Sequence, residues 1–487
     1  MRSSLSTFSR LGKKVLALFV LIASPAWAHS YTAIVGATLI DVSQGGRGSA
    51  DIADSVVLID RDDVAAVGRR GRLGLPHQTR IILASGKFLV PGLIDGFGAI
   101  RDARFAAAYL HQGVTTVHVP LSPPGGRIDG EDKILRLARP SVLTSAPISG
   151  YATDGSVPPA SAWAQHASSD RPLTDAQLVA EVDAAAAAGN HSIGIGPDVR
   201  PDQLATIARR ARKHGLAIFA EPAFAPYDAA IEAGVGAFMR NDKYQLWLAG
   251  PAAWAEYRAN PIGGGGRTAM RTICGGADGV DSAVDDFARQ LGGTFLMPIL
   301  VMEATADDVG GPNPWSLPAA RFFRPADLDD PVDPVTGARP YLAQHPERAE
   351  AIRACARRKQ AIDGRLHRAG AIYLAGSAAP SFGILPGSGL HVELRLLRDI
   401  GLSPREVLAA ATGNYARLFL DRGIIAAGRR ADLLLLDRDP RADVAALDRI
   451  SLVMAGGWVI DRRALEQSCG LSREAGPRCS EVGKRNP

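Results

Sequence analysis

The 487-residue sequence contains no apolar run long enough to cross a membrane. The run at residues 15–23 has nine residues, whereas a helix that spans a bilayer needs about 20. The sequence also has no run of like charge after residue 28, which leaves nucleic acid without support as a partner. With 46% hydrophobic residues, the chain is expected to be globular, without stable membrane insertion.

The first 28 residues have the pattern of a secretory signal peptide. Four basic residues precede the apolar run, and a small-x-small cleavage site follows it at residues 26–28. We expect cleavage after Ala28 and export to the periplasm or out of the cell; a retained membrane anchor is the alternative. Cleavage removes four positive charges and lowers the formal net charge from +5 to +1. The basic composition is therefore no argument for an acidic partner.

The sequence has only four cysteines. In an exported chain they are candidates for disulfides. Cys469 and Cys479 lie close together near the C-terminus and could close a small loop. Cys274 and Cys355 could form a second bridge. The alternative for all four is a free, buried thiol.

Both ends of the chain contain short apolar, β-branched segments that predict strands. Neither set is large enough to bury a core alone, so we expect the two ends to form one small β-domain together. The predicted strands are residues 33–41, 55–60, 64–68, 80–83, 431–437 and 450–460.

Between these ends, predicted helices that stop at glycine alternate with short apolar strands. This pattern favours a parallel sheet, and its length fits an eight-stranded α/β barrel. The Gly- and Pro-rich residues 251–346 interrupt the rhythm and predict a lid or binding loop around one embedded strand; a disordered surface insertion is the alternative. The predicted helices are residues 105–111, 175–188, 201–214 and 227–233, and the strands are 113–119, 191–195, 216–220, 235–239 and 294–300.

Several motifs in order resemble the amidohydrolase superfamily, in particular its imidazolonepropionase-like and prolidase-like branch. They occupy residues 86–95, 113–117, 390–394, 401–408, 428–433 and 456–461. The resemblance implies a β/α barrel beside a β-sandwich composed from both termini. The predicted division is a sandwich at 29–90 and 416–463, a barrel at 91–415 and a tail at 464–487.

The superfamily holds zinc or another divalent metal at the carboxyl ends of the barrel strands. The resemblance places these ligands as two His on strand one, Lys or Glu on strand four, His on strands five and six, and Asp on strand eight. In this sequence every one of these positions has changed; they hold Phe97, Ala99, Gly194, Glu221, Arg240 and Ala378. His191 lies near the fourth-strand position but is inadequate alone, because a catalytic zinc takes three protein ligands. We therefore predict no metal cofactor.

The residues that replace the ligands still face the predicted barrel mouth. Glu221 and Arg240 could form an ion pair; alternatively, Arg240 binds a substrate carboxylate and Glu221 acts as a base. His118 is either a hydrogen-bonded wall residue or a pocket residue, and Ser377 is a second pocket candidate. A new metal site formed by His118, Glu221 and Asp242 also stays open. His391 is expected to cap or pack a helix.

Two functions follow from this interpretation. In the first, the chain is a pseudoenzyme that binds a small molecule, having lost the family's metal-dependent hydrolysis of C–N bonds other than peptide bonds. In the second, it is an active hydrolase that uses Glu221 and His118, with Arg240 as an anion clamp.

Overall fold

The computed structural model describes residues 31–120, 140–151, 171–259, 272–275 and 278–471. The expected signal peptide and Cys479 lie outside these ranges. No helix within them combines the length and the apolar character needed to span a bilayer.

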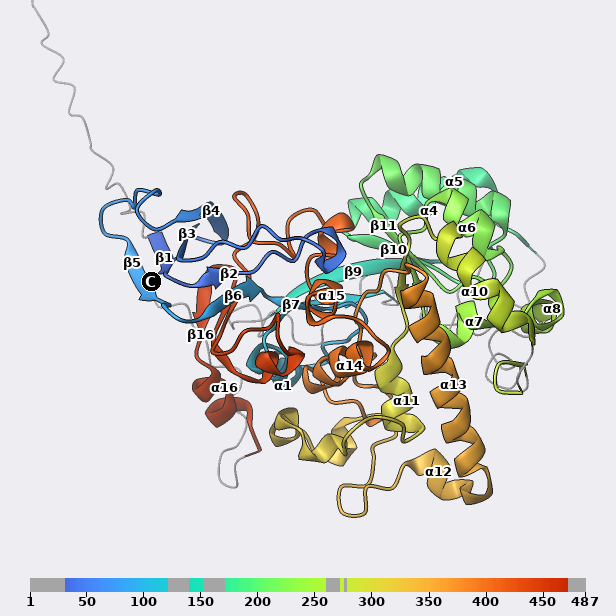
Figure 1. Cartoon of the computed structure of the whole chain (residues 1–487). Coiled ribbons are helices and arrows are strands. Elements are labelled where there is room, and N and C mark those ends of the chain that lie inside the picture. The colour runs from blue at the N-terminus through green and yellow to red at the C-terminus, as the bar shows by residue number, and fades with distance from the viewer. Residues whose placement is uncertain (1–30, 121–139, 152–170, 260–271, 276–277, 472–487) are drawn as a thin grey trace, which may run out of the picture.

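Seven parallel strands form the main sheet in chain order, and helices lie on its outside (Figure 1). A short extended segment supplies the eighth position: Leu374 N donates to Leu296 O at 2.8 Å on one side, and Gly96 N donates to Ala375 O at 3.1 Å on the other. The sheet thereby closes into the predicted barrel. The strands are β7 (Leu93–Asp95), β8 (Val114–Val119), β9 (Ser141–Ile148), β10 (Ser192–Ile195), β11 (Ala217–Ala220), β12 (Ala237–Met239) and β13 (Phe295–Met297).

The helices around the barrel begin and end where local sequence signals place them. Thr174 and Gln177 form a capping box at the start of α4, and Gly234, with φ +88°, ends α6. The predicted helices are confirmed to within two residues at each end. The barrel helices include α1 (Ala103–His111), α4 (Asp175–Ala187), α5 (Pro201–Lys213), α6 (Tyr227–Ala233), α7 (Asn241–Leu248), α10 (Asp278–Gln290), α13 (Ala349–Arg368) and α14 (Ser388–Asp399).

The third barrel strand, β9, has no counterpart among the predicted strands. Its sequence mixes Ser and Thr with apolar residues and contains Pro147, which pairs with Gly194 of the neighbouring β10. Proline cannot donate a ladder hydrogen bond and normally argues against an interior strand. Tertiary packing overrides that local signal here.

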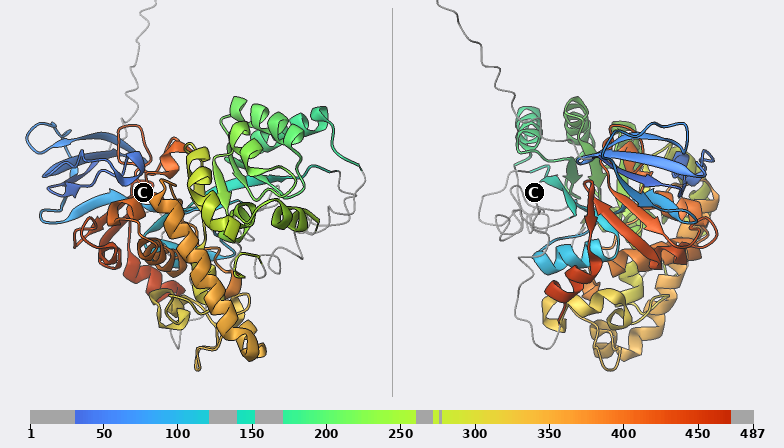
Figure 2. Two further views of the ribbon diagram at one scale, coloured as in Figure 1. Left: turned by 45° about the vertical axis from the view of Figure 1, so that its right-hand side comes forward. Right: turned by 90° about the vertical axis from the view of Figure 1, so that its left-hand side faces the viewer.

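The β-sandwich combines both ends of the chain, as predicted (Figure 2). β14 of the C-terminal part pairs antiparallel with β6 of the N-terminal part. Apolar side chains such as Ile34, Val57, Leu89 and Leu433 fill the space between the sheets. One sheet has the order β4 (Asp63–Arg69), β3 (Ser55–Asp60), β1 (Tyr31–Val35) and β5 (Arg80–Leu83); the other has β16 (Trp458–Ile460), β15 (Ile450–Ala455), β14 (Leu433–Leu436), β6 (Phe88–Pro91) and β2 (Thr38–Leu39).

The single strand predicted at residues 33–41 is wrong, because the chain splits there between the two sheets. Gly36 separates β1 from β2 and has φ +97°. A Cβ at this position would lie 2.3 Å from Arg70 Nη2 and 2.7 Å from Ser85 Oγ. Only glycine fits this turn, which sends the two halves of the segment into different sheets.

The Gly- and Pro-rich segment 251–346 contains more regular structure than a lid. It includes α8 (Pro251–Ala259), α10, the barrel strand β13 and α11 (Leu300–Ala306). The following excursion packs on the barrel's side: the rings of Phe323 and Phe105 lie 5.1 Å apart, and Asp327 accepts from Arg104 at 2.9 Å. The excursion contains α12 (Pro340–Gln344) and four 3-10 turns, η3 (Pro314–Ser316), η4 (Pro318–Phe322), η5 (Pro325–Asp327) and η6 (Pro346–Arg348).

Cys274 and Cys355 form a disulfide, with their Cα atoms 4.8 Å apart. This confirms the second disulfide that the sequence left open, and it links residue 274 covalently to α13. Cys469, at the end of α16 (Arg462–Cys469), is also disulfide-bonded. The predicted partner Cys479 lies outside the described residues.

Candidate functional site

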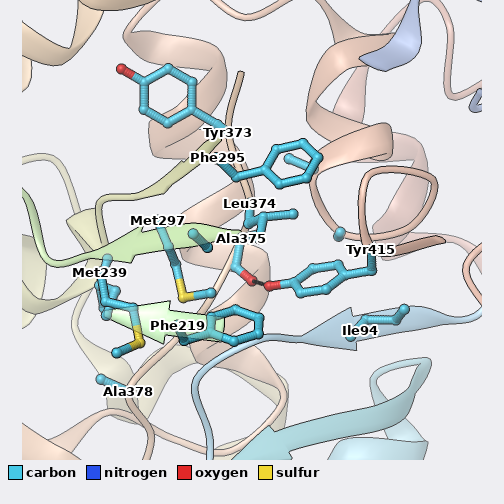
Figure 3. Close-up of a cluster of buried hydrophobic side chains, with 14 of the residues drawn as sticks. Ile94, Phe219, Met239, Phe295, Met297, Tyr373, Leu374, Ala375, Ala378 and Tyr415 are labelled. Atoms are coloured by element: carbon cyan, nitrogen blue, oxygen red, sulfur yellow. Dashed lines mark hydrogen bonds between the residues drawn. The ribbon is translucent and has the colours of Figure 1, made fainter. Parts of the chain in front are cut away.

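Large apolar side chains fill the barrel interior (Figure 3). Phe219, Met239 and Met297 lie fully buried on neighbouring strands. Tyr415 reaches in from beyond the last barrel helix and donates to Ala375 O at 2.6 Å. The space below the mouth is therefore a packed core, and chemistry is confined to the strand ends.

Four of the six positions that the motif resemblance assigns to metal ligands carry no ligand atom. Phe97 and Ala99 follow β7, and Ala378 is buried beside the eighth-strand segment. At Gly194, a Cβ would lie 2.5 Å from Pro120 O. The neighbouring backbone therefore fills the place that a lysine side chain would need.

Glu221 and Arg240 come together at the mouth, at the ends of neighbouring strands. Arg240 Nη1 lies 3.9 Å from Glu221 Oε2, which confirms the predicted pairing. The Glu221 side chain is 9% exposed and that of Arg240 is 35% exposed. Burial raises the pKa of Glu221 above its ordinary value, although Arg240 and Lys243 oppose this shift.

Asp242 and Lys243 extend the ion pair along the start of α7. Arg240 Nε lies 3.5 Å from Asp242 Oδ1, and Lys243 Nζ lies 3.3 Å from Asp242 Oδ2. Burial alone would raise the pKa of Asp242, but Lys243 and Arg240 outweigh it and hold the pKa well below its usual range. The mouth thus carries alternating, mutually neutralising charges, with Arg240 between two carboxylates.

The residues at the strand ends do not fit the metal that the superfamily uses. A catalytic zinc takes three protein ligands, but the six ligand positions supply one carboxylate, and the guanidinium of Arg240 lies beside it. Among the described residues, no group of three or more His, Cys, Asp or Glu side chains is placed to hold a metal ion. His118, Glu221 and Asp242 are thus not brought together as a ligand set.

His118 lies inside the barrel, below the ion pair. Its Nδ1 lies 3.0 Å from Gly96 O and its Nε2 lies 2.8 Å from Ser192 Oγ. The ring packs 4.3 Å from that of Phe219, and burial lowers the pKa to about 3. Both nitrogens are therefore engaged, and the neutral ring is that of a hydrogen-bonded wall residue.

Ser377 is fully buried and joins the last barrel segment to the first strand. Its Oγ donates to Asp95 Oδ2 at 2.5 Å, and its N–H donates to Asp95 Oδ1 at 2.8 Å. Burial raises the pKa of Asp95 to about 6, although the hydrogen bonds from Ser377 and Phe97 lower it. The structure thus gives Ser377 a partner in the barrel seam and no contact with Glu221 or Arg240.

His391 has the packing role that the sequence favours. Its Nε2 lies 2.8 Å from Gln112 O, and its Nδ1 lies 3.7 Å from Asp448 Oδ1. These contacts join α14 to the residues that follow α1 and β14.

A buried polar network lies behind the mouth, and it is not among the features predicted from the sequence. Its centre is Asp363 of α13, which accepts from Tyr244, Asn241, Gln245 and Tyr373 at 2.6–3.2 Å. Burial raises the pKa of Asp363 to about 7, against the effect of these hydrogen bonds. Asn241, Tyr244 and Gln245 belong to the polar run 241–245, which directly follows a barrel strand. That run is the sequence feature that could have indicated this part of the network.

Glu303 and Lys359 connect this network to the same side of the barrel. Lys359 Nζ lies 2.9 Å from Glu303 Oε1, and that oxygen also accepts from Asn241 at 2.8 Å. The carboxylates around Lys359 raise its pKa despite burial. The charged groups behind the mouth are therefore largely paired with one another.

No family model matches the chain, and no curated protein matches it in sequence. Solved structures are similar over most of its length. A bottromycin amidohydrolase has a TM-score of 0.64 at 20% identity, with 92% of each chain covered. Molinate hydrolase has a TM-score of 0.57 at 16% identity, covering 92% of this chain and 99% of that one.

A Xaa-Pro dipeptidase with methionine bound in its active site is also similar. Its TM-score is 0.56 at 15% identity, covering 89% of this chain and all of that one (100%). The resemblance found in the motifs is thus confirmed for the architecture: this chain has the fold of amidohydrolase and prolidase structures.

Proposed function

We propose that this chain is an amidohydrolase-superfamily protein whose barrel mouth binds a small amide-containing molecule without the superfamily's metal. One observation carries the proposal: Glu221 Oε1, Arg240 Nε and Tyr227 Oη are buried without a hydrogen-bond partner among the described residues. Such atoms are rare, because each costs roughly 1–3 kcal/mol. A ligand that supplies their partners would recover this free energy.

An amide group offers a hydrogen-bond partner to each of these three kinds of atom. Arg240 and Tyr227 offer donors to a carbonyl oxygen, and the Glu221 carboxylate offers an acceptor to an N–H. Burial raises the pKa of Tyr227 above its usual range, and Tyr257 and Glu221 add to the shift. The names of the fold relatives, an amidohydrolase and a Xaa-Pro dipeptidase, support the same ligand class.

The second candidate function is a hydrolase in which Glu221 acts as a general base. The observation in its favour is the raised pKa of Glu221 together with its unpaired oxygen, because a base with a pKa nearer neutrality accepts a proton more effectively. His118 does not contribute to this version, since both of its ring nitrogens are engaged inside the barrel.

We further propose that the protein works outside the cytoplasm. The N-terminal pattern supports export, and the Cys274–Cys355 disulfide fits an oxidising compartment.

Calorimetric titration with the dipeptide Met-Ala and with N-acetylmethionine, whose amides both carry an N–H, tests the binding function. We expect Arg240→Ala to weaken binding of the amide probe by at least about tenfold, because the ligand loses a charged donor. Arg200→Ala is the matched control, since Arg200 pairs with Asp202 on the surface of α5, and it should bind as wild type does. Unchanged binding by Arg240→Ala would contradict the mouth as the site.

Release of free methionine from Met-Ala separates the two candidate functions. The binding function predicts no release by the wild-type protein. Release that Glu221→Gln abolishes would establish the hydrolase instead, and release that survives Glu221→Gln would rule out Glu221 as the base.

A further inference from the structure

A cavity of about 340 Å³ lies beside the barrel, and neither Glu221 nor Arg240 is among its lining residues. Its walls come from the end of α11, from α12 and from the turn η7 (Ser381–Gly383). Both α11 and η7 follow the carboxyl ends of adjacent barrel segments, so the cavity is on the mouth side. Its chemically distinctive lining residues are Asp307, Asp330, Tyr341 and Phe382.

Two aromatic side chains are unusually accessible in this cavity. Tyr341 is 49% exposed and Phe382 is 38% exposed. Phe382 has φ +55°, a conformation that costs a bulky residue on the order of 1 kcal/mol. Its neighbour Gly383 is anchored by its N–H, which donates to Asp329 O at 2.7 Å. The fold thus holds a strained turn that presents an aromatic ring to the cavity.

Two carboxylates line the same cavity without a direct ion pair, although the positive charge of Lys359 acts on Asp307. Neither Asp307 nor Asp330 has an ion pair or hydrogen bond from its side chain within the described part of the chain. The cations of this region are engaged elsewhere. Arg339 and Arg353 lie 3.2 and 3.3 Å from Asp308, and Lys359 is bound to Glu303.

We propose that this cavity binds an organic ammonium ion with a compact aromatic or apolar body. The two carboxylates attract the cation, and Tyr341 and Phe382 offer ring faces for cation–π and apolar contact. The volume is at the lower end of the range for small-molecule sites, so the ligand is small. This inference does not depend on the function proposed for the mouth.

The proposal predicts how binding varies with pH. Burial raises the pKa of Asp307 to about 6, although Lys359 opposes the shift and Glu303 and Asp242 add to it. Asp307 is therefore protonated and neutral below this value and ionised above it. Affinity for an ammonium ion should rise as the pH increases through about 6 and then become constant, as long as the amine stays protonated.

Calorimetric titration with phenethylamine tests the proposal, with phenethyl alcohol as the neutral probe of similar shape. We expect phenethylamine to bind at least about fivefold more tightly than the alcohol, and Asp307→Asn to remove this preference. Phe382→Ala should weaken both probes. Asp228→Asn removes the same charge from the exposed surface of α6 and should leave binding unchanged.

Equal affinities of wild type for the amine and the alcohol would overturn the proposal, as would no heat up to about 10 mM amine. So would amine binding that Asp307→Asn and Asp330→Asn both leave intact. The comparison of probes on the wild-type protein does not depend on whether any variant folds.

Discussion

Replacing Asp363 by alanine is expected to lower the free energy of unfolding by about 4 kcal/mol. Asp363 is fully buried and accepts hydrogen bonds from four side chains of α7 and the eighth barrel segment. Alanine leaves the Tyr244 hydroxyl buried without an acceptor, which costs about 1–3 kcal/mol. The other three donors keep a second acceptor, so each loses one hydrogen bond of about 0.5–1.5 kcal/mol. Urea denaturation followed by circular dichroism measures the difference.

Asp363→Asn is the matched control, since it retains the shape and one acceptor oxygen. It also tests the protonation state. The pKa of Asp363 is raised from 3.8 to about 7, so its contribution to stability is fully present below about 3.8 and is lost as the pH rises through about 7. The stability of wild type relative to Asp363→Asn should therefore fall over this window. A difference that is constant with pH would contradict the raised pKa.

Replacing Asp95 by alanine is expected to lower the free energy of unfolding by about 3 kcal/mol. Asp95 is fully buried at the end of β7. It accepts from the hydroxyl and the N–H of Ser377 and from the N–H of Phe97. These bonds lie at the seam where the eighth segment closes the barrel on the first strand. Thermal unfolding at neutral pH measures the loss.

Two milder variants test whether the Asp95 carboxylate itself stabilises the seam, as opposed to a general loss of core packing. Ser377→Ala removes one partner of Asp95 and leaves two backbone donors, so it should cost about 1 kcal/mol. Asp95→Asn keeps an acceptor for the Ser377 N–H and should fall between the two. If Asp95→Ala were no more destabilising than Ser377→Ala, the carboxylate would not be what holds the seam.

The parts of the fold that follow from local periodicity could be predicted from the sequence. The Thr174 cap and the alanine-rich segment after it predict helix α4. The ends of two apolar strands identify Glu221 and Arg240 as strand-end residues. Parallel strands bring their carboxyl ends to one face of a barrel, so the pairing of these two residues follows from topology alone.

Features that depend on distant packing could not be predicted in this way. β9 is held between two other strands despite Pro147, and Asp363 lies more than a hundred residues from Asn241, to which it is hydrogen-bonded. His118 is placed inside the barrel by contacts with Gly96, Ser192 and Phe219, which come from three other strands or strand ends. No local pattern in the sequence connects these residues.

The charges at the strand ends come from the protein's own side chains. The guanidinium of Arg240 supplies the positive charge, between the carboxylates of Glu221 and Asp242. Because arginine stays protonated at any physiological pH, this charge is fixed and offers no open coordination position to a substrate.

The metal content of the purified protein, measured by mass spectrometry after growth with added zinc and manganese, tests this account most directly. The account predicts well under about one metal ion per ten chains, because a catalytic site needs three protein ligands and the strand ends supply one. One zinc or manganese per chain that Glu221→Gln and Asp242→Asn each remove would contradict it, since that result would place a metal where the structure has Arg240.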